Sequence, residues 1–296
     1  MNIPLDVLKI VASYLVKPKM KLLDWIPLNK LNWVLLSRNQ NAIYLLEQNM
    51  DKTKLTYGKI DWLYLSLNPN AIHLLEQNMD MIDWKLLSSN PNAIHLLEKN
   101  IDKIDWDYLS ANLNAINLLE QNMDKINWEF LSGNPNAINL LHQNMDKIYW
   151  LLLSKNPNAI HFLQQNIDKI NWNILSSNPN AIHLLQQNMD KIDWWYLSQN
   201  PNAIHLLQQN MDKIDWSSLS KNPNAIHLLE QNINMDGIDW SYLSINPNAI
   251  HLLEKNMDKI HWKELSSNPN IFEIDIKQLK IDITEKAKII DDIIHG

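Results

Sequence analysis

The chain has 296 residues, a formal net charge of −7 and no Cys. The absence of Cys excludes a disulfide framework, a thiolate metal site and a Cys nucleophile. A phosphate-binding surface needs clustered Lys and Arg, and the chain has no basic run, so we expect no nucleic acid partner. No apolar run reaches the ~18 residues that a membrane span needs, and the basic segment that opens a signal peptide is missing. We therefore expect an intracellular, soluble protein without membrane contact.

The first 32 residues differ from everything that follows. Leu5, Leu8, Val11 or Ala12, and Leu15 fall on one face of a predicted helix. That helix should end before Pro18, because the residue before a Pro disfavours the helical conformation. Terminal repeats of solenoids are atypical. We interpret residues 1–32 as an N-terminal helical cap over the exposed end of the array.

A 22-residue unit follows and recurs eleven times, each copy starting with Trp. Insertions at Thr53–Lys59 and around Asn234–Gly237 fall in the loop that ends a unit, where they disturb packing least. Length alone would suggest one or two globular domains, but a repeated unit predicts a single elongated array. The units start at Trp33, Trp62, Trp84, Trp106, Trp128, Trp150, Trp172, Trp194, Trp216, Trp240 and Trp262.

The unit, numbered from its Trp as position 1, predicts two short helices. Asp or Asn at position 22 is a strong N-cap for the first helix, whose positions 1, 3 and 4 are apolar on one face. Asn at position 7 is expected as a left-handed C-cap, followed by Pro. Asn at position 9 then caps a second helix, which buries positions 10, 11, 13 and 14 and ends at a left-handed Asn at position 17. Apolar residues at positions 18 and 21 should carry contacts through the return loop.

Helices of about two turns are not stable alone in water, so the units must stack. The predicted fold is all-α: an α-solenoid of about eleven 22-residue helix-turn-helix repeats over residues 33–270, with a C-terminal cap at residues 271–296. Axes ~8–10 Å apart give a rod or superhelix roughly 90–100 Å long. A leucine-rich repeat of similar period would need Leu at position 2. Lys85, Asp107 and Glu129 stand there, and a strand would bury their charges, so the helical interpretation is favoured.

The residues that suggest chemistry repeat with the unit. Metal ligands must surround one ion at ~2.1 Å, so His side chains one repeat apart are too distant from each other. We expect a hydrogen-bonding ladder that charges near pH ~6. The Trp column could stack nucleic acid bases, but core aromatics fit the acidic chain better. We expect no enzyme, no cofactor and no metal. The His ladder occupies position 12 as His73, His95, His161, His183, His205, His227 and His251.

Positions 2 and 6 vary from copy to copy while the core positions stay constant. They lie one helical turn apart and share a face. Repeat proteins that bind partners vary one exposed face in this way, whereas the alternative is that these are unconstrained solvent positions. Exposed apolar residues cost solubility, which favours binding. The candidate protein-binding face consists of Leu63, Leu67, Lys85, Asp107, Glu129, Leu151, Lys155, Trp195, Gln199, Lys221 and Ile245.

The recurring NPNAIHLLEQNMDKIDW and the preceding LLDWIPLNKLNW resemble the short-repeat proteins of giant nucleocytoplasmic large DNA viruses. The resemblance covers residues 22–270 and implies an ankyrin-like helical array of mostly unassigned role. IPLDVL at residues 3–8 and SYL at residues 13–15 are similar to the opening of an F-box, although KPKMK then departs from its continuation. Viral F-box repeat proteins recruit host cullin-type ubiquitin ligases. That resemblance makes Leu5, Leu8 and Leu15 candidate adaptor-docking residues.

Three functions remain open. The first is a non-enzymatic scaffold that binds a host or viral protein through the variable face of the solenoid. The second is an F-box-type substrate receptor, which requires the N-terminal helix to expose an apolar face rather than bury it on the first repeat. The third is a structural component of a virion or viral factory that uses the rod as a spacer. The protein would act in the host cytoplasm or the virion.

Overall fold

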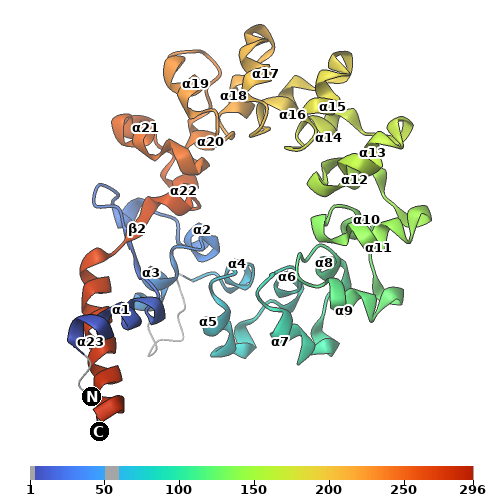
Figure 1. The fold of residues 1–296 in the computed structure, drawn as a ribbon. Coiled ribbons are helices and arrows are strands. Elements are labelled where there is room, and N and C mark those ends of the chain that lie inside the picture. The colour runs from blue at the N-terminus through green and yellow to red at the C-terminus, as the bar shows by residue number, and fades with distance from the viewer. Residues whose placement is uncertain (1–3, 51–59, 296) are drawn as a thin grey trace.

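The computed structural model describes residues 4–50 and 60–295. The repeats form an all-α solenoid that curves into a ring, with the first helix of each repeat on the inner side and the second on the outer side (Figure 1). The inner helices are α2 (Trp33–Arg38), α4 (Trp62–Ser66), α6 (Trp84–Ser88), α8 (Trp106–Ser110), α10 (Trp128–Ser132), α12 (Trp150–Lys155), α14 (Trp172–Ser176), α16 (Trp194–Ser198), α18 (Trp216–Leu219), α20 (Trp240–Ile245) and α22 (Trp262–Leu265). The outer helices are α3 (Ile43–Gln48), α5 (Ile72–Glu76), α7 (Ile94–Glu98), α9 (Ile116–Glu120), α11 (Ile138–His142), α13 (Ile160–Gln164), α15 (Ile182–Gln186), α17 (Ile204–Gln208), α19 (Ile226–Gln231) and α21 (Ile250–Lys255).

Short 3-10 helices complete most repeats. They occupy positions 18 to 20, a third element that the sequence did not predict. These are η1 (Leu28–Lys30), η2 (Met79–Met81), η3 (Ile101–Lys103), η4 (Met123–Lys125), η6 (Met145–Lys147), η8 (Ile167–Lys169), η9 (Met189–Lys191), η10 (Met211–Lys213) and η12 (Met257–Lys259). Others precede outer helices or follow the last inner one: η5 (Pro135–Ala137), η7 (Pro157–Ala159), η11 (Pro247–Ala249) and η13 (Pro269–Ile271).

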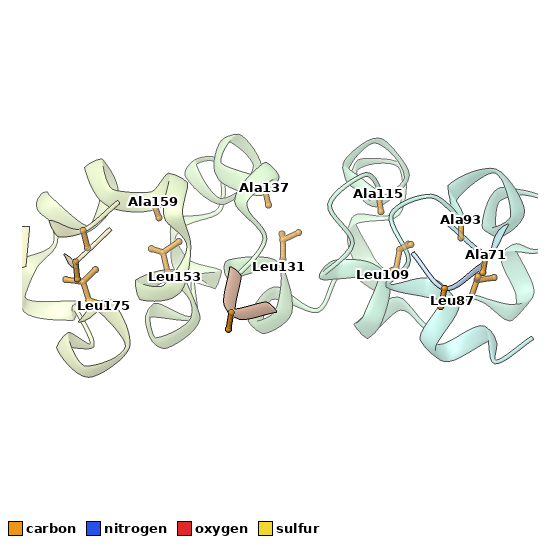
Figure 2. Close-up of a cluster of buried hydrophobic side chains, with 14 of the residues drawn as sticks. Ala71, Leu87, Ala93, Leu109, Ala115, Leu131, Ala137, Leu153, Ala159 and Leu175 are labelled. Atoms are coloured by element: carbon orange, nitrogen blue, oxygen red, sulfur yellow. The ribbon is translucent and has the colours of Figure 1, made fainter. Parts of the chain in front are cut away.

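The core runs from repeat to repeat as columns of identical side chains. Leu at position 4 and Ala at position 10 are fully buried, as at Leu109 and Ala115. Figure 2 shows these two columns side by side. Positions 13 and 14 of the outer helix are also buried, as at Leu118 and Leu119. Because every copy presents the same shape to the next, the columns merge into one continuous core.

The start of the inner helix is confirmed as predicted. The Asp61 carboxylate accepts a hydrogen bond from the Tyr64 backbone N–H at 3.0 Å, and Asp105 does the same for Tyr108 at 3.1 Å. Such an N-cap satisfies a backbone donor that has no partner within the helix. Nine of the eleven described inner helices have such a cap and begin at their Trp although they are only four to six residues long, whereas Tyr149 and His261 before α12 and α22 provide no side-chain cap.

The left-handed caps expected at positions 7 and 17 are wrong, because no non-Gly residue among those described has a positive φ. Asn at position 7 instead joins adjacent repeats. Nδ2 of Asn90 donates to the carbonyls of Ser66 at 2.9 Å and Asn68 at 3.1 Å in the preceding repeat. Its Oδ1 accepts from the Asn92 N–H at 3.0 Å. The buried amide is thus fully paired, as a buried polar group must be.

The other two Asn columns also differ from prediction. At position 9, Asn92 leaves the outer helix uncapped, and its Nδ2 donates to the Pro69 carbonyl of the preceding repeat at 2.9 Å. At position 17, Nδ2 of Asn100 donates to the Leu96 carbonyl at 2.9 Å, one turn back in its own helix. These amides supply hydrogen bonds where unusual backbone conformations were expected.

The last repeat contacts the first through the same bonds that join consecutive repeats. Nδ2 of Asn39 donates to the Ser266 carbonyl at 3.1 Å and the Asn268 carbonyl at 2.9 Å. The Asn32 N–H donates to Oγ of Ser266 at 2.8 Å, as the Asp83 N–H does to Oγ of Ser66 at 3.0 Å. The array therefore closes on itself into a ring, and the predicted open rod or superhelix roughly 90–100 Å long is wrong.

The array closes because its curvature accumulates from repeat to repeat. A small rotation at each repeat bends a solenoid, and eleven repeats complete one turn. The expected length becomes the circumference through the inner helices, about 100 Å at ~9 Å per step. That circumference gives a diameter of about 30 Å, and a helix with its side chains is ~10–12 Å thick. The central opening is then roughly 20 Å across.

The repeat at the junction is split between the two ends of the chain. The C-terminal part supplies α22, and the N-terminal part supplies η1 and Leu31, which is buried like Ile104 at the equivalent position 21. Lys30 lies 4.5 Å from the Trp262 ring centre, matching Lys103 over Trp84 at 4.5 Å in an intact repeat. The inner helix and the 3-10 end of the eleventh repeat are therefore brought together from opposite ends of the chain.

A two-stranded sheet takes the place of the missing outer helix. Strand β1 (Met20–Leu22) pairs antiparallel with β2 (Phe272–Ile274), with Leu22 opposite Phe272. The Leu23 N–H donates to the Ile271 carbonyl at 2.9 Å. These bonds connect segments about 250 residues apart in sequence.

Beyond the sheet, the two chain ends form what we call the terminal arm, α1 (Leu5–Leu15) and α23 (Ile276–His295). Leu8 and Ala12 of α1 pack against Ala287 of α23 in a core of their own. Both terminal segments depart from the repeat as expected. They do not cover two separate ends, however, because the described residues leave no open end to cover, and α1 is buried on α23 rather than on the first repeat.

The insertions fit their predicted places where they are described. Asn234–Gly237 lies between α19 and α20, and Gly237 has a φ of 102°, a conformation that favours glycine. Thr53–Lys59 lies outside the described residues.

Candidate functional site: the inner band of the ring

The inner helices lie on the inner side of the ring (Figure 1), and we infer that their positions 2 and 6 face its centre. At ~100° per residue they lie on the opposite side of the helix from position 4, which is buried toward the outer helix, as at Leu65. Position 3 lies beside them. We call the side chains at positions 2, 3 and 6 of the inner helices the inner band. All eleven candidate residues on the predicted binding face belong to it.

Most of the candidates are exposed, and four of them are large and apolar. Leu63, Leu151, Trp195 and Ile245 have 46, 41, 47 and 39% of their surface exposed. Lys85, Asp107, Glu129 and Lys155 are exposed, whereas Leu67, Gln199 and Lys221 are half-buried. Position 6 is more covered at these three places because it sits at the helix end, beside the next repeat.

Two large apolar, exposed members of the inner band are not among the predicted candidates. Val34 at position 2 is 38% exposed, and Phe130 at position 3 is 41% exposed. Position 3 was assigned to the core because it is usually apolar. It lies on the flank of the helix, so its side chains are only partly covered, and Tyr64, Tyr108 and Tyr196 are half-buried.

One aromatic cluster of the inner band surrounds Trp195. The Trp195 ring meets Tyr196 edge to face, with ring centres 4.7 Å apart. Nζ of Lys221 lies 5.8 Å from the Trp195 ring centre and 3.8 Å from that of Tyr242. Cation–π contacts of this kind hold a cation at an aromatic face. They link α16 and α20 into one surface of apolar rings around a single charge.

A second cluster lies across α6, α8 and α10. Lys85 Nζ lies 5.1 Å from the ring centre of Tyr108, which is 6.3 Å from that of Phe130. Nδ2 of Asn127 donates to Asp107 at 2.8 Å. The inner band therefore carries aromatic groups, aliphatic groups and both signs of charge on one curved surface.

The His ladder lies on the outer helices, away from the inner band. Where the preceding repeat has Glu at position 15, the His bonds to it: His95 to Glu76 at 2.9 Å and His251 to Glu230 at 2.6 Å. His205 meets Gln209 of its own helix at 3.1 Å instead. No group of three metal-ligating side chains occurs among the described residues. The ladder is a set of hydrogen bonds, some of which join repeats.

The Trp column is only partly core. Trp62 is buried, but the other repeat Trp side chains are half-buried, packed against the core on one side. A Lys from position 20 covers the other side, as Lys147 does at 4.5 Å from the Trp128 ring centre. This pairing was not predicted, because the Asp-Lys pairs were interpreted as solvated loop charges.

Position 18 forms an apolar stripe that was expected to be internal. Met145 is 43% exposed and Ile167 is 46% exposed. Their 3-10 helices hold these side chains at the surface, while Ile at position 21 is buried, as at Ile148. Position 18 is nearly constant, so it lacks the variation expected of a surface that selects one partner.

The candidate adaptor-docking residues separate into two kinds. Leu8 is only 2% exposed because it packs against α23, whereas Leu5 and Leu15 are 44% and 58% exposed. Ile3 of the F-box-like opening lies outside the described residues. A docking surface on α1 could use Leu5 and Leu15 but not Leu8.

A shallow groove of about 950 Å³ crosses the outer side of the ring near the junction. Lys19, Tyr44, His73 and Ile274 are among its lining residues, and no member of the inner band is.

Within the described ranges, no helix has the length and apolarity to cross a membrane. No protein family, curated protein or solved structure matches the chain. Its function is therefore argued from its own geometry.

Proposed function

We propose that the protein is a non-enzymatic scaffold that binds a protein partner on the inner band of its ring. The observation that carries the proposal is the contrast within each repeat. The core, the Asn and Ser columns and the Trp–Lys pairs repeat almost unchanged. The residues that vary most are gathered on the side that faces the opening.

The inner band has the chemistry of a protein-binding surface. Interfaces are enriched in Trp, Tyr, Phe and Arg, and a few buried aromatic anchors carry most of their binding energy. Trp195 is 47% exposed. Its ring packs against Tyr196, and this contact limits the number of side-chain conformations of Trp195 before binding. It is the side chain best suited to enter a partner's pocket or to pack under a partner's helix.

The shape of the ring restricts what can bind there. An opening of roughly 20 Å admits one α-helix with its side chains, which is ~10–12 Å wide, or an extended chain. The partner is thus a helical or extended polypeptide segment that carries apolar residues. A ring joined by buried Asn bonds is rigid, and a preorganised surface loses less entropy on binding.

A peptide selection tests this function. A random peptide library is selected on the full chain, and the affinity of selected peptides is measured by fluorescence anisotropy. Loss of an anchor costs about 2 kcal/mol, so Trp195→Ser should weaken binding about 30-fold. His183→Ser on the outer helix α15 is the matched control and should bind as the wild type does. Failure to select any peptide, or equal binding by Trp195→Ser, contradicts the proposal.

A ligase-receptor role is a second candidate, favoured by the exposed Leu5 and Leu15 on α1. It assigns α1 to an adaptor protein and the inner band to the target. A purified cullin-ligase adaptor that binds the wild type and not Leu15→Lys would support it. A structural component of a virion or viral factory stays the third alternative, and it would have to use a ring in place of the expected long rod.

A further inference from the structure

Helix α1 is apolar around most of its circumference. One side carries Leu8 and Ala12, which pack on α23. The other carries four exposed residues spaced i, i+3, i+4 and i+7, which lie on one helical face. We call these four the α1 stripe: Val7 is 47% exposed, Ile10 60%, Val11 46% and Tyr14 86%.

The α1 stripe has no role within the terminal arm. The contact with α23 uses the opposite side of α1, with Leu8 and Ala12 almost fully buried. Only Asp6, Lys9 and Ser13 are polar in the helix. A helix that is apolar on so many sides is normally buried all round. The α1 stripe is therefore an apolar surface that stays exposed in the single chain.

Helix α23 carries exposed apolar side chains of its own. It is 20 residues long against 11 for α1, so α1 covers only part of it. Ile289 and Ile293 of α23 are 51% and 77% exposed. With Leu5, Leu15 and the α1 stripe, the arm presents eight large apolar side chains that are about half exposed or more. Together they provide an area on the order of the ~800 Å² that each partner buries in a stable complex.

Charge restricts the partner. Helix α23 contains four Lys and four acidic residues, and α1 contains one of each, so the arm has no net charge. Helices that lie on membranes carry a face rich in Lys and Arg, and a strongly charged protein would need a complementary charge here. A neutral apolar surface does not repel its own copy.

The geometry also suits a second copy. A two-fold interface brings the same patch of both copies together, and two helix pairs joined through apolar faces make a four-helix bundle. Helix α23 of the arm extends away from the ring (Figure 1). Two arms can therefore meet without bringing the rings into collision.

We propose that two copies of this chain associate through their α1 stripes, so that the terminal arms form a four-helix bundle joining two rings. This inference is independent of binding at the inner band. A ring carrying Trp195→Ser should therefore still form the dimer.

Sedimentation velocity on the full chain tests the proposal. We expect a species of twice the 34.7 kDa chain mass. Tyr14→Lys should raise the dimer dissociation constant at least ~10-fold, because it places a charge in an apolar interface. Ser13→Lys adds the same charge at the adjacent exposed position, on the polar side, and should leave dimerisation unchanged. Tyr14 is so exposed that neither variant should alter the melting temperature or the circular dichroism spectrum.

Three results would overturn the proposal. One is a wild-type monomer up to about 100 µM, where a dimer of micromolar affinity is fully formed. Another is a dimer that Tyr14→Lys and Ile10→Lys leave intact. The third is a monomer that sediments with neutral phosphatidylcholine vesicles and is released by Tyr14→Lys, which would assign the α1 stripe to a membrane surface.

Discussion

The side-chain amide of Asn39 donates to the backbone carbonyl of Asn268 at 2.9 Å, across the junction of the first and last repeats. Asn112 makes the same bond to Asn90, also at 2.9 Å, between two consecutive repeats. The junction therefore repeats the Asn hydrogen bonds of an ordinary repeat contact. It differs from the other interfaces in having the β1–β2 sheet in place of an outer helix, and both ends of the chain hold it together.

The Asn column should be a main source of stability. Asn156→Ala removes three hydrogen bonds and leaves two buried carbonyls of the preceding repeat without their donor. At ~1 kcal/mol for each bond, plus the cost of unpaired groups, we expect a loss of about 3–4 kcal/mol in the free energy of unfolding. Urea denaturation measures it. Asn158→Ala, whose amide makes one exposed bond, is the control and should cost at most ~1 kcal/mol.

A closed ring predicts that Asn39→Ala lowers the free energy of unfolding about as much as Asn156→Ala does. In an open array the first repeat has no predecessor, and Asn39→Ala would cost little. In the ring its amide bonds to Ser266 and Asn268, so Asn39→Ala should cost about 3 kcal/mol, close to the value for Asn156→Ala. A cost below ~1 kcal/mol for Asn39→Ala alone would show that the junction is not formed.

Leu8 should stabilise the packing of α1 on α23 and should not affect the stability of the ring. Truncating a buried Leu costs ~2–5 kcal/mol, and Leu8 is 2% exposed in the separate arm core. We expect Leu8→Ala to speed hydrogen exchange in α1 and to leave exchange in α12 unchanged. Val7→Ala, at an exposed neighbour, is the matched substitution. Faster exchange throughout the ring in Leu8→Ala would show that the arm and the ring are one cooperative unit.

Two deletions should separate the arm from the ring. Removing residues 1–16 deletes α1 but keeps β1 and the N-terminal half of the split repeat, so the ring should keep its cooperative thermal transition. Removing residues 1–31 also deletes η1 and Leu31, which complete the eleventh repeat. That variant should melt at a lower temperature. Equal melting of the two variants would contradict the split repeat.

The ion pair between Lys19 and Asp282, 3.0 Å apart, should make the arm sensitive to pH. A hydrogen bond from Gln278, and then one from Lys19, lowers the pKa of Asp282. The hydrogen bond to Asp282 also raises the pKa of Lys19. The Asp282 contribution is thus complete above its unfolded pKa of ~3.9 and is lost as pH falls through the lower folded pKa. The Lys19 contribution is complete below ~10.4 and is lost as pH rises through the higher folded pKa.

Hydrogen exchange in α23, followed from pH 7 down to pH 3, measures the acid side of this effect. We expect protection to fall below pH ~4 in the wild type after correction for the intrinsic exchange rate. Asp282→Asn should remove that pH dependence. An unchanged profile in Asp282→Asn would assign the acid sensitivity to other carboxylates.

The repeat elements could be predicted from sequence because each is set locally. Asp61 before Trp62 marks the start of a helix by its own hydrogen bond, and Leu65 lies on the apolar side by simple periodicity. The role of Asn90 could not be predicted in this way, because its partners are carbonyls in another repeat. The preference of Asn for left-handed helix caps led to a wrong prediction. The hydrogen bonds that a buried amide makes to another repeat do not follow from the local sequence.

Ring closure depends on a rotation of a few tens of degrees per repeat, which the pattern of apolar residues does not encode. A signal was nevertheless present. Residues 28–32, LNKLN, match positions 18 to 22 of the unit, as in MDKID at residues 211–215. A repeat end that precedes the first repeat implies a repeat start elsewhere, and residues 262–270 at the other end of the array supply it.

The candidate site was predictable in its residues but not in its place. Trp195 and Leu63 were identified because they vary at positions opposite the core. Only the closed ring shows that they line an opening. The α1 stripe could not be predicted, because the sequence allows either Val11 or Ala12 on the face of Leu8. Only the packing of Leu8 and Ala12 against α23 shows that Val11 lies outside that face.

Spin labels across the junction test the closed ring most directly. The chain has no native Cys, so labels attach only where Cys is introduced. Arg38→Cys with Ser267→Cys labels position 6 of the first and last repeats, and Lys155→Cys with Ser177→Cys labels it in two consecutive repeats. The ring predicts label separations near ~10 Å for both pairs and therefore equal dipolar broadening in the electron paramagnetic resonance spectrum. Broadening in the Lys155–Ser177 pair but none in the Arg38–Ser267 pair would show an open array and contradict the account.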